Sequence, residues 1–185
     1  MPQQRQNGWR RLAFSVLTRA GWKVVGTFPD VPRLVLIAAP HSSWWDGVWG
    51  LLTKSALGID LAFMGKRELF IGPLGWALRW AGGIPIERDH AHGLVGQMTE
   101  RMRNANSLWL GIAPEGTRKR VARWKSGFWH IAHDAGVPIL PIYFHYPEKT
   151  IGVGALFYPS DDRAADLAKL REFYAPWQGR NHGIE

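Results

Sequence analysis

Short apolar runs alternate with amphipathic stretches along this chain. The apolar runs, bounded by turn residues, predict strands at residues 23–27, 33–38, 60–65, 107–113, 137–144 and 151–157, with an extended segment at 82–88. Helical spacing predicts helices at residues 9–20, 44–57, 91–104, 126–135 and 162–174, and the GPLG stretch at 72–75 predicts a turn. Because strands and helices alternate, we expect an α/β fold: a single-domain sandwich with a central mixed, largely parallel β-sheet flanked by helices.

The first predicted helix is amphipathic and has a basic side with Arg10 and Arg11. One face carries only apolar residues: Trp9, Leu12, Ala13, Val16, Leu17 and Ala20. Such a stripe fits two structures. It suits a helix that lies on a membrane surface, and it equally suits a helix that covers the core of its own domain.

Length and composition indicate one domain over residues 1–185. The chain is 46% hydrophobic, which is enough for a real core. We divide it into an N-terminal amphipathic helix at 1–22, a motif-bearing core at 33–146 and a C-terminal extension at 147–185. The absence of cysteine excludes disulfides and thiolate chemistry. The histidines form no HExxH-like pair, so we expect neither a metal nor a cofactor.

The charge of the chain indicates an anionic partner. The formal net charge of +8 suits nucleic acid, an acidic carrier protein or a phospholipid surface. Eleven tryptophans favour the lipid surface. Nucleic-acid modules typically show repeated aromatics on a sheet or a dense basic recognition helix, and we find neither in the sequence. No uncharged apolar run approaches the ~18 to 20 residues of a spanning helix, and the polar N-terminus lacks a signal-peptide core. We therefore expect a cytoplasmic protein, peripherally associated with the inner face of the cell membrane.

A histidine and a carboxylate stand five positions apart in the stretch APHSSWWD at residues 39–46. On one helix this offset turns the two side chains about 140° apart, so His41 and Asp46 meet only if the chain bends between them. A strand-to-helix turn at Pro40 would allow this. A carboxylate on one imidazole nitrogen leaves the other free to take a proton. Asp46 also fits a capping box with Ser43, which would serve only the helix start.

Further polar residues follow other predicted strands, where α/β folds tend to collect their ligand sites. Arg88 ends the extended segment, and Glu115 and Arg118 follow the strand at 107–113. Together with Lys66, the two arginines could cradle an anion, because a guanidinium suits bidentate contact with phosphate. Each cation could equally be a solvated surface charge. Glu115 could accept a hydrogen bond from a substrate hydroxyl, or it could brace Arg118.

Four short motifs follow one another along the chain: HxxxxD at 41–46, GxIPIxR at 82–88, PEGTR at 114–118 and VPILP at 137–141. Their order and approximate spacing resemble those of the glycerolipid and lysophospholipid acyltransferases, of the 1-acylglycerol-3-phosphate acyltransferase type. The KREL stretch at 66–69 and WKSG at 124–127 resemble further parts of that family. One such motif is weak evidence, but four in register are strong.

The resemblance implies an O-acyltransferase that moves a fatty acyl group from an acyl thioester to the hydroxyl of a lysophospholipid or glycerol-phosphate-like acceptor. The donor would be acyl-CoA or an acidic acyl carrier protein, acting as a co-substrate. The family's histidine is the general base and its aspartate orients it, which implies these roles for His41 and Asp46. The resemblance also implies six substrate-binding residues: Lys66, Arg88, Glu115, Gly116, Thr117 and Arg118.

Two alternatives stay open at this level. The acceptor could be an amine or a lipid without phosphate. The chain could also be a basic module that binds anionic membranes without chemistry. If the chain is the acyltransferase that the resemblance implies, its expected partners are the thioester donor, a lipid acceptor and an anionic membrane surface.

Overall fold

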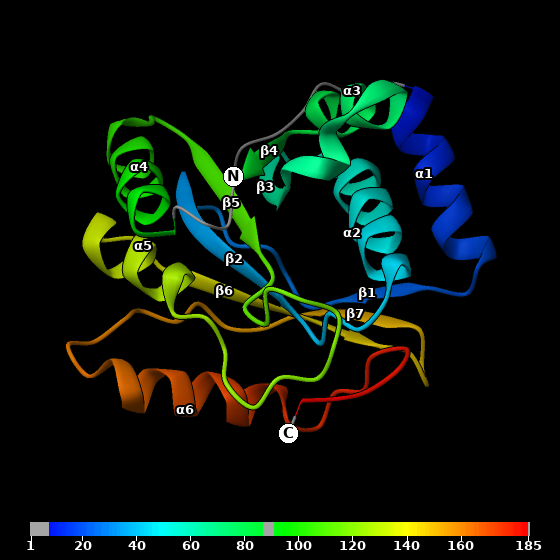
Figure 1. Ribbon diagram of the computed structural model, residues 1–185. Helices are drawn as coiled ribbons and strands as arrows, with labels where there is room; N and C mark the ends of the chain where they lie inside the picture. The colour runs from blue at the N-terminus through cyan, green and yellow to red at the C-terminus, as the bar shows by residue number, and fades with distance from the viewer. Residues whose placement is uncertain (1–7, 87–90, 185) are drawn as a thin grey trace.

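The computed structural model describes residues 8–86 and 91–184, which form a seven-stranded sheet with helices on both faces (Figure 1). The strands are β1 (Lys23–Val25), β2 (Arg33–Ala39), β3 (Leu61–Lys66), β4 (Gly83–Ile86), β5 (Leu108–Ile112), β6 (Ile139–His145) and β7 (Thr150–Val153). Their order across the sheet is β1-β7-β6-β2-β5-β3-β4, and only the β6–β7 pair is antiparallel. The predicted mixed, largely parallel sheet is confirmed.

The helices are α1 (Gly8–Arg19), α2 (Trp44–Leu57), α3 (Gly72–Trp80), α4 (Ala91–Asn104), α5 (Gly127–Ala135) and α6 (Arg163–Tyr174), with a short 3₁₀ helix, η1 (Arg67–Phe70). The five predicted helices lie close to their predicted positions, and α3 and the short 3₁₀ helix were not predicted. One core cluster joins the sheet to α1 and α2, and a second joins its other face to α4, α5 and α6. The protein is therefore a three-layer α/β sandwich.

The central strand β2 separates the two core clusters. Leu34 and Leu36 point into the cluster under α2, whereas Val35 and Ile37 point into the cluster under α5 and α6. All four are buried. A strand covered on both faces needs apolar residues at every position, which explains the unbroken apolar run of this segment.

Two predicted elements differ from the structure. Residues 72–75 begin α3 and are not a free turn: Pro73 lies in its first turn, where a missing N–H costs no helical hydrogen bond. Gly75 packs so tightly on Phe70 that a Cβ there would lie 2.1 Å from the Phe70 carbonyl carbon. The strand predicted at 151–157 ends at Val153, and Phe157 keeps only an isolated bridge to Ile139.

The apolar stripe of α1 is divided between the core and the surface. Ala13 and Leu17 are buried against α2, whereas Trp9, Leu12 and Val16 are exposed. The core interpretation is thus correct for one half of the predicted face. A further apolar residue, Phe14, is also exposed.

The C-terminal turn of α2 makes hydrogen bonds with the neighbouring elements. Arg10 of α1 donates to the carbonyl oxygen of Leu57 at 3.0 Å. The buried Lys54 ammonium donates to the carbonyl oxygens of Leu61 and Ala81, just before β4. The start of α1 and the end of α3 therefore lie near each other (Figure 1). Among the described helices, none is both long and apolar enough to cross a bilayer.

Candidate active site

The turn from β2 into α2 forms the centre of the site. Ser43 is the N-cap of α2, and its hydroxyl accepts the Trp45 N–H at 3.3 Å. Asp46, in the first helical turn, accepts the backbone N–H groups of Ser42 and Ser43 at 2.7 and 2.8 Å. The predicted capping box is therefore confirmed.

The same turn brings His41 and Asp46 together. Nδ1 of His41 lies 3.3 Å from Oδ2 of Asp46, whose side chain is fully buried. The His41 side chain is 28% exposed, and its Nε2 has no hydrogen-bond partner within residues 8–86 and 91–184. One carboxylate thus both caps α2 and lies against Nδ1 of the imidazole, whose side chain is partly exposed. The two interpretations of Asp46 are compatible.

A tyrosine that sequence analysis missed completes the shell of Asp46. Tyr146 follows β6, and its hydroxyl donates to Oδ1 of Asp46 at 2.5 Å. Burial and the Asp46 carboxylate raise the pKa of Tyr146 well above its usual value, so it remains a protonated donor. Only its position after a predicted strand could have indicated Tyr146, because β6 lies next to β2, parallel to it, and ends at the same edge of the sheet.

Glu115 supports the backbone of the turn that carries His41. It follows β5, the other neighbour of β2, and its Oε2 accepts the backbone N–H of His41 at 2.8 Å. Its Oε1 is buried and has no partner in the described part of the chain. Desolvation raises the pKa of Glu115 to about 7, against the opposing effect of the His41 N–H. The Glu115 carboxyl therefore contacts the backbone of His41. Within the described residues it does not brace Arg118, which was one of the two roles considered from the sequence.

The loop after Glu115 holds three more of the predicted residues. Gly116 has φ of +64°, and a Cβ there would lie 3.0 Å from Lys125, so both backbone and space favour glycine. Thr117 accepts the backbone N–H of Lys119. The Arg118 guanidinium carbon lies 3.8 Å from the centre of the Trp44 ring, a cation–π contact. Its Nη1 is buried without a partner among the described residues.

The remaining predicted residues are less closely connected. Lys66 is exposed at the end of β3, which β5 separates from β2. It shares the carboxyl edge of the sheet with His41, but no contact joins it to His41, Asp46, Glu115 or Arg118 within the described residues. Arg88 lies outside the described residues. Among those residues, no cluster of histidine, aspartate and glutamate is arranged to hold a metal ion.

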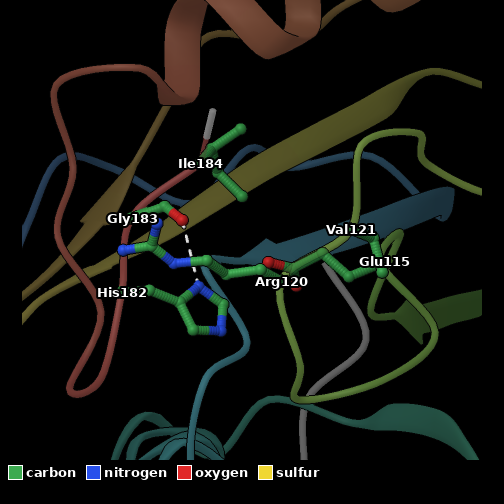
Figure 2. A pocket seen from close by; sticks show the side chains of 6 residues that line it. All are labelled: Glu115, Arg120, Val121, His182, Gly183 and Ile184. Carbon is green, nitrogen blue, oxygen red and sulfur yellow. Dashed lines mark hydrogen bonds between the residues drawn. The ribbon is translucent and has the colours of Figure 1, made fainter.

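The C-terminal segment, residues 177–184, forms a second wall of the site. Asn181 donates its backbone N–H to the Ser42 hydroxyl at 3.1 Å and its side-chain amide to the Ser42 carbonyl at 2.6 Å. Figure 2 shows His182, Gly183 and Ile184 facing Glu115 and the loop residues Arg120 and Val121 across a cavity of about 10 Å³, room for about one water molecule. No motif in the sequence marks this segment.

Comparison with known proteins shows the family of this chain. Residues 17–145 match the family described as acyltransferase. The chain belongs to this family. The match includes every predicted site residue and ends one position before Tyr146, so Tyr146 and the C-terminal segment lie outside it.

Several relatives of this acyltransferase carry the name 1-acyl-sn-glycerol-3-phosphate acyltransferase. The Streptococcus pneumoniae protein is 29% identical over 144 residues, 77% of this chain and 53% of that protein. The chloroplastic protein of Brassica napus is 31% identical over 154 residues, covering 80% of this chain and 43% of its own. The Escherichia coli protein is 34% identical over 101 residues, covering 50% and 40%. The chain thus spans about half, or less, of the length of these relatives.

A solved structure shares the fold. The crystal structure of the 1-acyl-sn-glycerophosphate (LPA) acyltransferase PlsC from Thermotoga maritima superposes with a TM-score of 0.63, covering 92% of this chain and 80% of that one. Sequence identity is 19%, so this likeness concerns the fold.

The Glu115 carboxyl predicts a specific pH dependence of stability. Its pKa is about 7 in the folded chain against an ordinary 4.5, so the folded state binds the proton more tightly than the unfolded state. This stability is fully present below pH 4.5 and is lost as the pH rises through 7, by on the order of 3 kcal/mol. We expect urea titrations to show this decline in the wild type but not in Glu115→Gln. The exposed Glu172→Gln change should keep the decline, and parallel wild-type and Glu115→Gln curves would contradict it.

Proposed function

We propose that this acyltransferase moves a fatty acyl group from a thioester to the hydroxyl of a 1-acylglycerol-3-phosphate or a similar glycerol-phosphate acceptor. The observation that carries the proposal is the His41–Asp46 pair, with Nδ1 on the buried carboxylate and Nε2 accessible. The names of the matched relatives support the class of acceptor.

The proposed reaction needs only one base. His41 Nε2 takes the proton of the acceptor hydroxyl as its oxygen bonds to the thioester carbonyl carbon. The carbon–sulfur bond then breaks, and the leaving thiolate receives the proton from the imidazole. A thioester needs little activation, so base catalysis of ~10²- to 10⁴-fold together with positioning is a sufficient division of work. Glu115 contributes by holding the backbone of His41.

Arg118 is the proposed contact for the acceptor phosphate. Its guanidinium lies over the Trp44 ring, and its buried Nη1 lacks a partner among the described residues. An unpaired buried donor is costly unless a ligand satisfies it, and an anion satisfies it best. Arg88 and Lys66 remain candidates from the sequence.

The donor carrier would meet a basic loop beside the site. Between residues 118 and 125 this loop carries five cations, and buried Trp124 anchors it: Arg118, Lys119, Arg120, Arg123 and Lys125. Acyl-CoA and acyl carrier protein are both anionic, so the charge of the loop suits either donor.

The face formed by α1 and α3 is the proposed membrane contact. Seven large apolar side chains are exposed on one side of α1 and at α3, with Phe14 exposed elsewhere on α1: Trp9, Leu12, Val16, Ile71, Leu74, Trp76 and Trp80. Arg11 and Arg19 are exposed beside them. Tryptophan with nearby cations suits the headgroup region of an anionic membrane. The proposed location is therefore peripheral, at the membrane surface that holds the lipid acceptor.

The catalytic assignment predicts that His41→Ala abolishes acyl transfer while the fold stays intact. Asp46→Asn should be milder but still severe, because it keeps the shape and loses the charge that orients the ring. The measurement is free thiol released from acyl-CoA and acyl carrier protein with lysophosphatidate, glycerol 3-phosphate and a lyso-amine lipid. His130→Ala, a histidine far from the turn, is the control and should keep wild-type turnover. Near-wild-type turnover in a folded His41→Ala variant would remove the base assignment.

Arg118→Ala should raise the acceptor KM about tenfold for a phosphorylated acceptor and much less for one without phosphate. The reason is the loss of a charge-assisted contact to phosphate. The exposed Arg163→Ala change should leave both KM values unaltered. An equal loss for the two acceptors would mean that Arg118 only supports Trp44.

Membrane contact predicts co-sedimentation with anionic vesicles that weakens with salt but does not vanish. Each cation near the surface contributes about 1 kcal/mol, screened over a Debye length, and the tryptophan rings supply the part that salt does not affect. The double change Trp9→Ala, Trp76→Ala should lower the remaining binding. Exposed Tyr158→Ala, on another part of the surface, should not. Wild-type protein that stays in the supernatant at low salt would contradict the contact.

A further inference from the structure

The two oxygens of the Asp46 carboxylate have different partners. Oδ2 receives the N–H groups of Ser42 and Ser43 and lies 3.3 Å from the His41 ring. Oδ1 receives the Tyr146 hydroxyl, its one hydrogen bond within the described residues. Because the side chain is fully buried, water does not replace that donor. The hydroxyl therefore opposes rotation of the carboxylate about its Cβ–Cγ bond.

Tyr146 is itself held firmly. Its backbone N–H donates to the carbonyl oxygen of Gln178 at 2.9 Å, which ties it to the C-terminal segment. Its ring packs edge-on against Trp22, with the ring centres 5.0 Å apart. Trp22 packs in turn on Trp49 of α2, with ring centres 5.1 Å apart. The hydroxyl thus reaches Asp46 from a fixed framework outside the turn that carries the pair.

We propose that Tyr146 is a positioning residue of this active site: its hydroxyl holds Asp46 in the orientation that aligns the His41 imidazole for proton transfer. The inference rests on the proposed function and extends it by a residue beyond the part of the chain that matches the family. A hydrogen bond to a buried charge is worth more than one between neutral groups. Its loss should therefore affect turnover measurably.

The first test is Tyr146→Phe, which removes one oxygen and keeps the packed ring. Turnover should fall about tenfold, because fewer molecules hold the imidazole aligned. The KM values for donor and acceptor should stay within about twofold, since Tyr146 contacts the carboxylate and not a substrate subsite. All variants are assayed below the lowest of their melting temperatures, so a change in stability does not enter the rates.

A double-mutant cycle then separates positioning from general support. If Tyr146 acts through Asp46, removing its hydroxyl in the Asp46→Asn background should change turnover by less than about twofold. A merely structural role would produce the same tenfold loss in both backgrounds. That additive outcome would overturn the proposal.

Tyr174→Phe is the matched control. The buried Tyr174 hydroxyl donates to the backbone oxygens of Ile37 and Ile142, so its loss should lower the melting temperature but leave kcat unchanged. An active wild type with an equally active Tyr146→Phe variant contradicts the role of Tyr146 alone. A wild type that releases no thiol from any donor contradicts the proposed function instead.

Discussion

The site depends on one constraint, which is the burial of the Asp46 carboxylate. Taking a carboxylate out of water costs several kcal/mol unless donors surround it. Here the donors are the N–H groups of Ser42 and Ser43 in the turn after β2 and the hydroxyl of Tyr146 at the end of β6, and Nδ1 of His41 lies 3.3 Å away. Satisfying one charge therefore brings a turn, a helix start and a neighbouring strand into one geometry.

The parallel sheet makes this geometry possible. β2 lies between β5 and β6 and parallel to both, so Ile112 ends beside Ile37, and Tyr143 lies beside Ala39. Residues that follow the three strands then meet at one edge of the sheet, although Tyr146 lies 105 positions after His41 in the chain. Glu115 secures the backbone of His41 from one side, and the C-terminal segment secures Ser42 from another.

The layers also decide which residues around β2 and α2 are buried and which are exposed. Strand β2 is buried from Leu34 to Ile37 and at Ala39, so this part of the chain contributes to packing. On the α2 side, α1 covers the core with Ala13 and Leu17 and leaves Trp9 and Leu12 exposed. Trp44, at the start of α2, is also exposed and contacts Arg118 beside the turn that carries His41 and Asp46. An exposed aromatic ring and a guanidinium thus lie together beside the turn that carries His41 and Asp46.

Local patterns were sufficient for most of the strands and helices, the bend between His41 and Asp46 and the capping box, because these depend on neighbours within a few residues. Helix α3 was missed because Gly72-Pro73 is typical of turns, whereas in the structure Pro73 lies in the first helical turn and Gly75 packs on Phe70. The tertiary structure decided the partner of Glu115, the stacking of Arg118 on Trp44, the split of the α1 stripe and the contact between Tyr146 and Asp46. These contacts join distant segments, and no spacing along the chain encodes which strand ends meet when the sheet assembles.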